Sequence, residues 1–220
     1  MKKLLMILAI MAVACTASAQ LVITGVVDGP LPGGLPKCIE LYSCGDIADL
    51  SVYGLGSANN GGGTDGIEFT FPADVVAAGT FIYVEALNST YPTSFFDFFG
   101  FNADYDGGFA VNHNGDDAIE LFLTAGVPDP IVVDVFGDIN TDGTGEPWDC
   151  LDGWAKRVTF TGPDGSMFNL ANWTFSGPDA LDGELTNDTA AVPFPLGGYE
   201  CDPTVSTEDA NWGAVKSLYR

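Results

Sequence analysis

Short apolar runs separated by clusters of Gly, Pro, Asn and Asp follow one another along the chain from about residue 21. The runs are rich in β-branched and aromatic residues and show no helical periodicity, which is typical of β-strands. Their regular spacing predicts an all-β sandwich. We expect strands at Leu21–Val27, Cys38–Ser43, Leu50–Leu55, Glu68–Phe71, Thr80–Glu85, Ala118–Leu123, Ile131–Phe136 and Trp154–Phe160.

Two of these strands carry the same apolar-polar alternation. Residues 38–42 read CIELY and residues 118–122 read AIELF. Because successive side chains of a strand point to opposite faces of its sheet, Ile and Leu of both strands are predicted to face the core. Glu40 and Glu120 are then expected to face outward, as ordinary surface residues do.

The polar segments between the runs have an unusual composition. Residues 56–66 form a Gly/Asn connector, residues 111–117 contain an Asn-Gly turn, and residues 138–149 link two strands. Five phenylalanines lie within FFDFFGF at residues 95–101, which we expect to fold over the end of the sandwich as core; an exposed apolar patch for a partner is the alternative. From about Asn187 the chain is rich in Thr, Pro and Gly, which predicts an extension.

The first 19 residues have the features of a secretion signal. A basic start, an apolar stretch and an Ala-Ser-Ala cleavage site follow in order, so the mature chain is expected to begin at Gln20. The alternative is a lipoprotein with a lipid on Cys15. No later apolar run approaches the roughly 20 residues of a membrane span. These features predict a secreted protein, extracellular or at the cell surface.

Charge narrows the possible partners. Without the two lysines of the signal, 5 basic residues face 30 acidic ones, and 5 minus 30 gives a net charge of −25. A field of this sign repels phosphate backbones and anionic lipids and concentrates cations. Direct binding of nucleic acid is therefore not expected.

Four cysteines remain after cleavage of the signal, and an even number in an exported chain predicts two disulfides. Along an extended strand Cys38 and Cys44 would lie about 20 Å apart, whereas a disulfide tolerates Cα separations of about 4.4 to 6.8 Å. Each is therefore expected to pair with Cys150 or Cys201, in a connectivity left open, and Cys201 would hold the C-terminal extension on the domain.

Several blocks of the chain together resemble the lamin-tail domain of bacterial secreted proteins. The blocks lie between about Leu21 and Glu184 and read KCIELYSCGDIADLSVYGLGS, EFTFPADVVAAGTFIYVEA, NGDDAIELF, VVDVFGDINTDGTGEPWD, DGWAKRV and NWTFSGPDALDGE. The resemblance implies an immunoglobulin-like β-sandwich that serves as a non-catalytic module. It also implies three segments: a signal peptide at residues 1–19, the lamin-tail-like domain at 20–185 and the extension at 186–220.

Two departures from the family limit what is carried over. Relatives often accompany an extracellular endonuclease or exonuclease domain, for which this chain has no room, so their catalytic activity is not expected. The cysteines are a local addition to the family pattern. The family also supplies no catalytic residues to transfer.

The segment DINTDGTGEPWD is the strongest candidate for a metal site. Acidic or amide side chains occupy relative positions 1, 3, 5, 9 and 12, and Gly143 stands at position 6, as in a calcium-binding loop. The shorter Asp at position 12 and Gly145 at position 8 argue against an EF-hand and for a looser structural calcium site; the alternative is an Asx-rich turn. The predicted ligands are Asp138, Asn140, Asp142, the carbonyl of Thr144, Glu146 and Asp149.

The sequence contains few of the residues and motifs that enzymes use for catalysis. His113 is the only histidine, and neither GxSxG nor HExxH occurs. A glycosidase needs only two carboxylates, of which Glu40 and Glu120 would be the first pair to inspect, but their positions favour ordinary surface residues. Trp148, Trp154, Trp173 and Trp212 are expected to be core residues rather than a sugar-binding platform.

We therefore predict a secreted, non-enzymatic module that binds or tethers a protein or cell-surface partner. One alternative is an accessory to a separately encoded secreted nuclease or phosphoesterase, and another is a carbohydrate-binding or carbohydrate-hydrolysing protein. Self-association through the edge strands of the sandwich is a further hypothesis.

Overall fold

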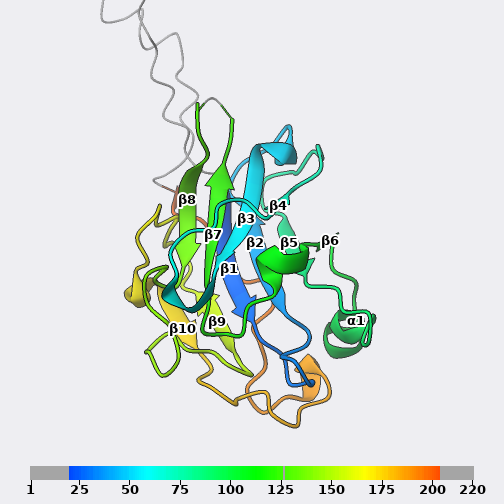
Figure 1. Cartoon of the computed structure of the whole chain (residues 1–220). Helices are drawn as coiled ribbons and strands as arrows, with labels where there is room; N and C mark the ends of the chain where they lie inside the picture. The colour runs from blue at the N-terminus through cyan, green and yellow to red at the C-terminus, as the bar shows by residue number, and fades with distance from the viewer. Residues whose placement is uncertain (1–19, 126, 204–220) are drawn as a thin grey trace, which may run out of the picture.

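A computed structural model describes residues 20–125 and 127–203, so the predicted signal peptide and Trp212 lie outside the described residues. The described chain is all-β, with two sheets and little helix (Figure 1). Its strands are β1 Leu21–Val27, β2 Cys38–Ser43, β3 Tyr53–Ala58, β4 Phe69–Thr70, β5 Phe81–Glu85, β6 Tyr105–Asp106, β7 Ala118–Leu123, β8 Ile131–Phe136, β9 Trp154–Arg157 and β10 Trp173–Phe175. The helices are α1 Ser94–Phe99 and the short 3-10 turns η1 Leu50–Val52, η2 Asn59–Gly61, η3 Gly108–Val111, η4 Leu170–Asn172 and η5 Asn187–Thr189.

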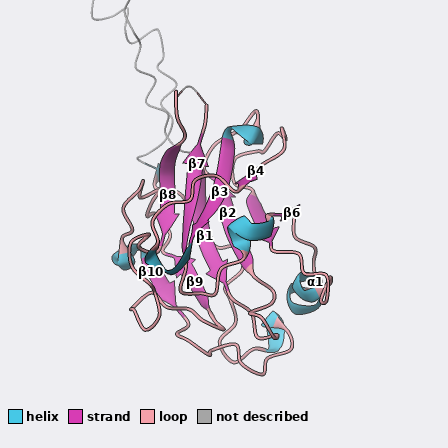
Figure 2. Ribbon diagram, in the orientation of Figure 1, coloured by secondary structure: helices cyan, strands magenta, loops and turns pink. Residues whose placement is uncertain are grey.

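The strands form a six-stranded sheet in the order β10-β9-β1-β2-β5-β6 and a four-stranded sheet in the order β4-β3-β7-β8 (Figure 2). All neighbours are antiparallel except β5 and β6. One hydrophobic cluster takes side chains from both sheets, including Ile39 and Leu41 of β2 and Ile119 and Leu121 of β7. The alternation prediction is confirmed for these four residues, and the molecule is a two-sheet sandwich.

The strand predictions agree with β1, β2, β7 and β8 at both ends. The predicted strand at Leu50–Leu55 begins late, because Asp49 accepts a hydrogen bond from Ser51 N and holds residues 50–52 in a 3-10 turn. The predicted strand at 154–160 ends at Arg157, and Phe160 has a positive φ of 63°. Two very short strands, β6 and β10, carry too few residues to show a period.

The outer face of the six-stranded sheet is covered by a second hydrophobic layer. Helix α1 supplies Phe95, Phe98 and Phe99, and the C-terminal part of the chain supplies Leu181 and Phe194. These side chains pack on outward-facing residues of β1, β2 and β9. The FFDFFGF segment is therefore core at those three phenylalanines, as predicted, but as a helix on a sheet face; Phe96 is exposed.

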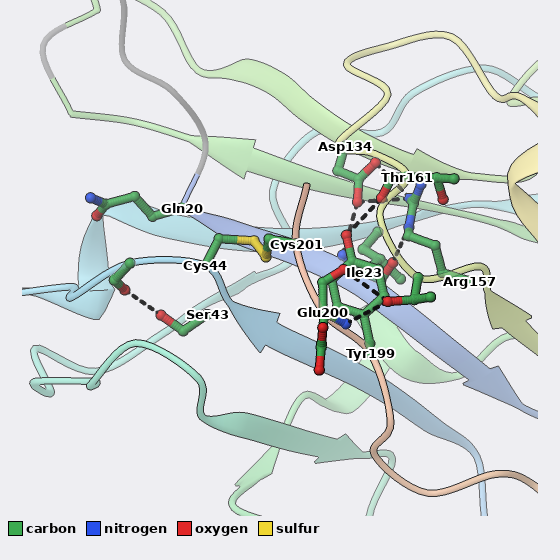
Figure 3. Close-up of a disulfide and its surroundings, with 12 residues drawn as sticks. Gln20, Ile23, Ser43, Cys44, Asp134, Arg157, Thr161, Tyr199, Glu200 and Cys201 are labelled. Atoms are coloured by element: carbon green, nitrogen blue, oxygen red, sulfur yellow. Dashed lines mark hydrogen bonds and ion pairs between the residues drawn. A yellow bond between two sulfur atoms is a disulfide. The ribbon is translucent and has the colours of Figure 1, made fainter. Parts of the chain in front are cut away.

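A single disulfide fastens the C-terminal segment to the sandwich. Cys44, directly after β2, is bonded to Cys201 with a Cα–Cα distance of 5.8 Å (Figure 3). The prediction that Cys38 and Cys150 also form disulfides is wrong, because both are free and buried. Cys38 faces the outer hydrophobic layer and Cys150 belongs to the central cluster, so their sulfurs lie in separate cores.

Within the described residues, no helix combines the length and apolar composition that crossing a lipid bilayer requires.

Candidate functional site

The predicted calcium loop follows β8 and consists of turns that its own aspartates stabilise. Asp138 accepts hydrogen bonds from Asn140 N (3.0 Å) and Thr141 Oγ1 (2.9 Å). Asp142 accepts from Thr144 N (3.0 Å), which lowers the pKa of its carboxyl. Asp149 is buried and accepts from Gly145 N (2.8 Å) and from Leu151 N (3.0 Å). These are the bonds expected of an Asx-rich turn.

The six predicted ligands differ in exposure. Asp138, Asn140, Asp142, Thr144 and Glu146 are exposed and Asp149 is buried. Among the described residues, the group of carboxylates whose ligand atoms all lie within 4.8 Å of one another is a different one, Asp152, Asp179 and Asp182. The loop carboxylates accept hydrogen bonds from their own chain, and each ionised carboxylate keeps further acceptor positions. Calcium binding stays a prediction.

The cluster of Asp152, Asp179 and Asp182 could not be found from sequence spacing. Asp152 has a positive φ of 44°, and Leu181 N donates to its carbonyl (2.9 Å), which brings the two chain segments together. Only the tertiary contact makes these aspartates neighbours.

A cleft of about 490 Å³ opens beside the predicted calcium loop. Its lining includes the polar side chains of Asp138, Asn140 and Glu146 and an apolar wall formed by Met167, Phe168 and Leu170. The Trp148 ring, which is buried, packs edge-on against Phe136 and Phe168 at centroid distances of 5.8 and 6.0 Å. The cleft therefore combines carboxylates with an apolar wall.

The basic side chains of the described chain are all buried. Lys37, Lys156 and Arg157 are each less than 10% exposed, and each lies in an ion pair. The accessible charge of residues 20–125 and 127–203 is accordingly carried by carboxylates. A positively charged partner meets no competing cation on this surface.

Lys37 forms the first of these ion pairs, with Asp28. Its Nζ donates to Asp28 Oδ1 (2.8 Å), to Asn114 Oδ1 (3.2 Å) and to the His113 carbonyl. Burial raises the pKa of Asp28 to about 6, although the Lys37 charge opposes this effect. The pair is saturated with hydrogen bonds, as a buried charge requires.

Arg157 joins the two sheets. Its guanidinium donates to both oxygens of Asp134 on β8 (2.7 and 2.9 Å) and to Asp164 (2.7 Å), while its Nε donates to the Ile23 carbonyl of β1 (Figure 3). The same guanidinium lies over the Trp173 ring at 4.5 Å. This geometry makes Arg157 a structural clamp.

The prediction that Glu40 and Glu120 face solvent is wrong, because both are buried. The alternation places them on the outer faces of their sheets, as expected, but other chain segments cover those faces. Glu40 Oε1 accepts from Lys156 Nζ and from Thr24 Oγ1 (2.6 Å). Its Oε2 accepts from Tyr83 OH (3.0 Å) and from Gly197 N (2.9 Å).

Glu120 has fewer hydrogen-bond partners than Glu40 and lacks a basic partner among the described residues. Its Oε2 is buried without a hydrogen-bond partner among the described residues. Burial raises the pKa of Glu120; a hydrogen bond from Thr64 opposes this effect, and the Asp65 charge adds to it. Since the two glutamates belong to different sheets and point to opposite outer faces, they do not form the carboxylate pair of a glycosidase.

His113 is fully buried, and its Nδ1 accepts from Gly115 N (3.2 Å). Burial, and then the nearby Lys37 charge, lower its pKa to about 3. The imidazole is therefore neutral at ordinary pH. The three described tryptophans, Trp148, Trp154 and Trp173, are core residues, as predicted.

Comparison of the chain with protein-family models, with curated proteins and with solved structures finds no match. The lamin-tail resemblance accordingly stays a prediction that rests on its sequence blocks.

Proposed function

We propose that the protein is a secreted, non-catalytic binding module with a lamin-tail-like, immunoglobulin-like sandwich, and that it attaches to a positively charged protein or cell-surface partner. The observation that carries this proposal is the burial of Lys37, Lys156 and Arg157 in ion pairs. A carboxylate-rich surface without accessible described cations favours association with cationic partners and raises their association rate.

The disulfide supports the exported location. Disulfides persist in oxidising compartments outside the cytosol, and Cys44–Cys201 joins segments 157 residues apart in the sequence. A module that works outside the cell gains from such a tether, because the C-terminal segment stays on the sheet.

Affinity capture tests the proposal. Immobilised mature protein is exposed to the envelope and medium fractions of the producing cells, and bound proteins are eluted with rising salt, which screens exposed charge pairs. An unrelated acidic protein of matched net charge is the control. We expect a basic partner that the control does not retain; recovery of nothing, or of the same proteins on both supports, contradicts a specific binding function.

A structural calcium ion is proposed as a separate property of the loop at residues 138–149. Calorimetric titration of chelator-treated protein, followed by thermal melts, decides it. An ion that binds the folded state raises the melting temperature, and Asp142→Ala should abolish the rise. Identical melts of the parent with and without calcium make the segment an acidic turn.

A further inference from the structure

The cleft beside the loop at residues 137–148 has the chemistry of a site for one long, positively charged side chain. We propose that it binds a lysine or arginine side chain presented by a basic peptide segment of the partner. This inference rests on the proposed function, and it names the place and the ligand chemistry that the general surface charge leaves open.

The apolar wall of the cleft is unusually accessible. Met167 is 78% exposed and Leu170 is 41% exposed, and both line the cleft next to the partly buried Phe168. A lysine or arginine stem is itself apolar and lies readily along such a surface while its charged head stays in polar surroundings. The wall therefore matches the stem of the side chain.

The loop at residues 138–149 supplies the charge. Asp138 and Glu146 line the cleft and are exposed. The carboxylate of Asp138 accepts two hydrogen bonds from its own loop, but an ionised carboxylate has about four acceptor positions. Positions for a guanidinium or ammonium group thus remain. The described cations, Lys37, Lys156 and Arg157, lie in ion pairs elsewhere, so no described cation competes there.

The size of the cleft suits a side chain, and its polarity disfavours phosphate groups and bare metal ions. A volume of about 490 Å³ falls within the range of roughly 300 to 1,000 Å³ that is usual for ligand sites. Phosphate groups would meet two carboxylates of the same sign. A bare metal ion would not use Met167 and Leu170, because calcium takes oxygen ligands.

Methionine labelling provides a local probe. The sequence has four methionines, and Met167 alone lies beyond the predicted signal peptide. In exported, processed protein labelled with ¹³C at the methionine methyl, the single resonance therefore reports on the rim of the cleft. The ligands are blocked five-residue peptides with a central arginine, or with citrulline, which has the same shape without the charge. All titrations contain a chelator.

We expect the arginine peptide to shift the Met167 resonance in a saturable and salt-sensitive way, and the citrulline peptide to leave it in place. Glu146→Gln should weaken binding about threefold, as the loss of an exposed charge pair predicts. Asp188→Asn removes the same charge in η5, which packs against α1, and should leave the affinity unchanged.

Each other outcome overturns the inference. Equal shifts with both peptides would show that charge is not recognised, no shift would show that the cleft is not the site, and equal weakening by both substitutions would show only general attraction to an acidic surface. Recovery of a specific partner in the capture experiment together with no Met167 shift would leave the proposed function standing and refute the cleft. Failure of both refutes the function itself.

Discussion

The outer faces of the two sheets carry the same local sequence pattern, but the glutamate on each face has different partners. On each face an Ile-Glu-Leu triplet points its glutamate outward, and the residue paired with that glutamate on the neighbouring strand is a glycine: Gly25 opposite Glu40, and Gly56 opposite Glu120. Each glycine leaves room for a covering segment. A Cβ on Gly25 would lie 2.4 Å from Phe194 Cζ, and one on Gly56 would lie 2.1 Å from the Gly66 carbonyl oxygen.

The covering segments differ in what they bring. Over Glu40, the C-terminal segment adds Gly197 N and the Phe194 ring, which lies 5.0 Å from the ammonium of Lys156. Over Glu120, the connector at residues 59–66 adds Thr64 but also the like charge of Asp65. The first glutamate is thus neutralised and the second is not. A buried carboxylate stabilises a fold only when its cover supplies donors and a cation.

The largest expected effect is at Glu40. Glu40→Gln leaves Lys156 buried without a counter-charge, so the free energy of unfolding should fall by about 3 to 5 kcal/mol, measured by urea denaturation. Replacing both residues by methionine should recover part of the loss, because it removes the unpaired ammonium but leaves Thr24, Tyr83 and Gly197 N without their acceptor. If the unfolding free energy of Glu40→Gln lies within about 1 kcal/mol of that of the parent, the ion pair is not buried in solution.

The next effect concerns the tether of the C-terminal segment. Replacing Cys44 and Cys201 by serine should lower the free energy of unfolding by about 2 to 5 kcal/mol, because the unfolded chain regains the freedom that a long disulfide loop removes. The parent under reducing conditions serves as the control and should behave alike. If stability is unchanged, packing by Phe194 and Tyr199 alone holds the segment.

Substitutions at Gly25 and Gly56 test how closely the covering segments pack on the two sheets. Gly25→Ala and Gly56→Ala should each cost about 1 to 3 kcal/mol through overpacking. Most of the cost at Gly25 should disappear in a Phe194→Ala background, because the Phe194 ring is its nearest contact and, of its nearest contacts, only Glu40 Cβ, at 3.2 Å, stays close. Gly56 meets backbone first and has no such relief. Double-mutant cycles of unfolding free energy measure this coupling. A persistent cost of Gly25→Ala in the Phe194→Ala background would contradict the contact.

The smallest expected change in the free energy of unfolding is an increase, and it concerns Glu120. Glu120→Gln should raise the free energy of unfolding by about 1 kcal/mol at pH 7, because it removes a buried carboxylate that lacks a full set of partners. The folded-state pKa of Glu120 is raised, so the protonated form favours folding: its contribution is complete below the ordinary value of 4.5 and is lost as pH rises through the folded-state pKa. The variant and parent should therefore agree near pH 4 and diverge above it.

A matched charge loss at exposed Asp188 should show no such divergence. Denaturation curves collected across this pH range provide the comparison. A Glu120→Gln variant less stable than the parent at neutral pH would show that the carboxylate has donors there.

The sequence predicted which residues would form most of the sandwich and how their side chains alternate. It predicted the long strands β1, β2, β7 and β8 because each carries enough residues to show a period. It did not predict α1, because five phenylalanines in seven positions mask helical periodicity. The glycines within β1 and β3 did carry a signal that another chain segment approaches closely.

The candidate site was less accessible to sequence reasoning. The loop at residues 138–149 was predicted to bind calcium, which stays a prediction; its carboxylates accept the hydrogen bonds of an Asx-rich turn, which was the alternative. The cleft beside that loop also depends on Ser166, Met167, Phe168 and Leu170, which form no motif and reach the loop only through the fold. The spacing of residues within one segment predicts a turn. It cannot predict a cleft whose lining comes from two segments.

By itself the sequence determined the all-β class, the core-facing residues and the strongly negative charge, because periodicity, composition and charge are local or additive properties. Only the tertiary structure decided which cysteines pair, that every described cation is buried, and that the two outward glutamates are covered. These features depend on contacts between segments up to 157 residues apart, and alternation states which face a side chain takes but not what lies above it.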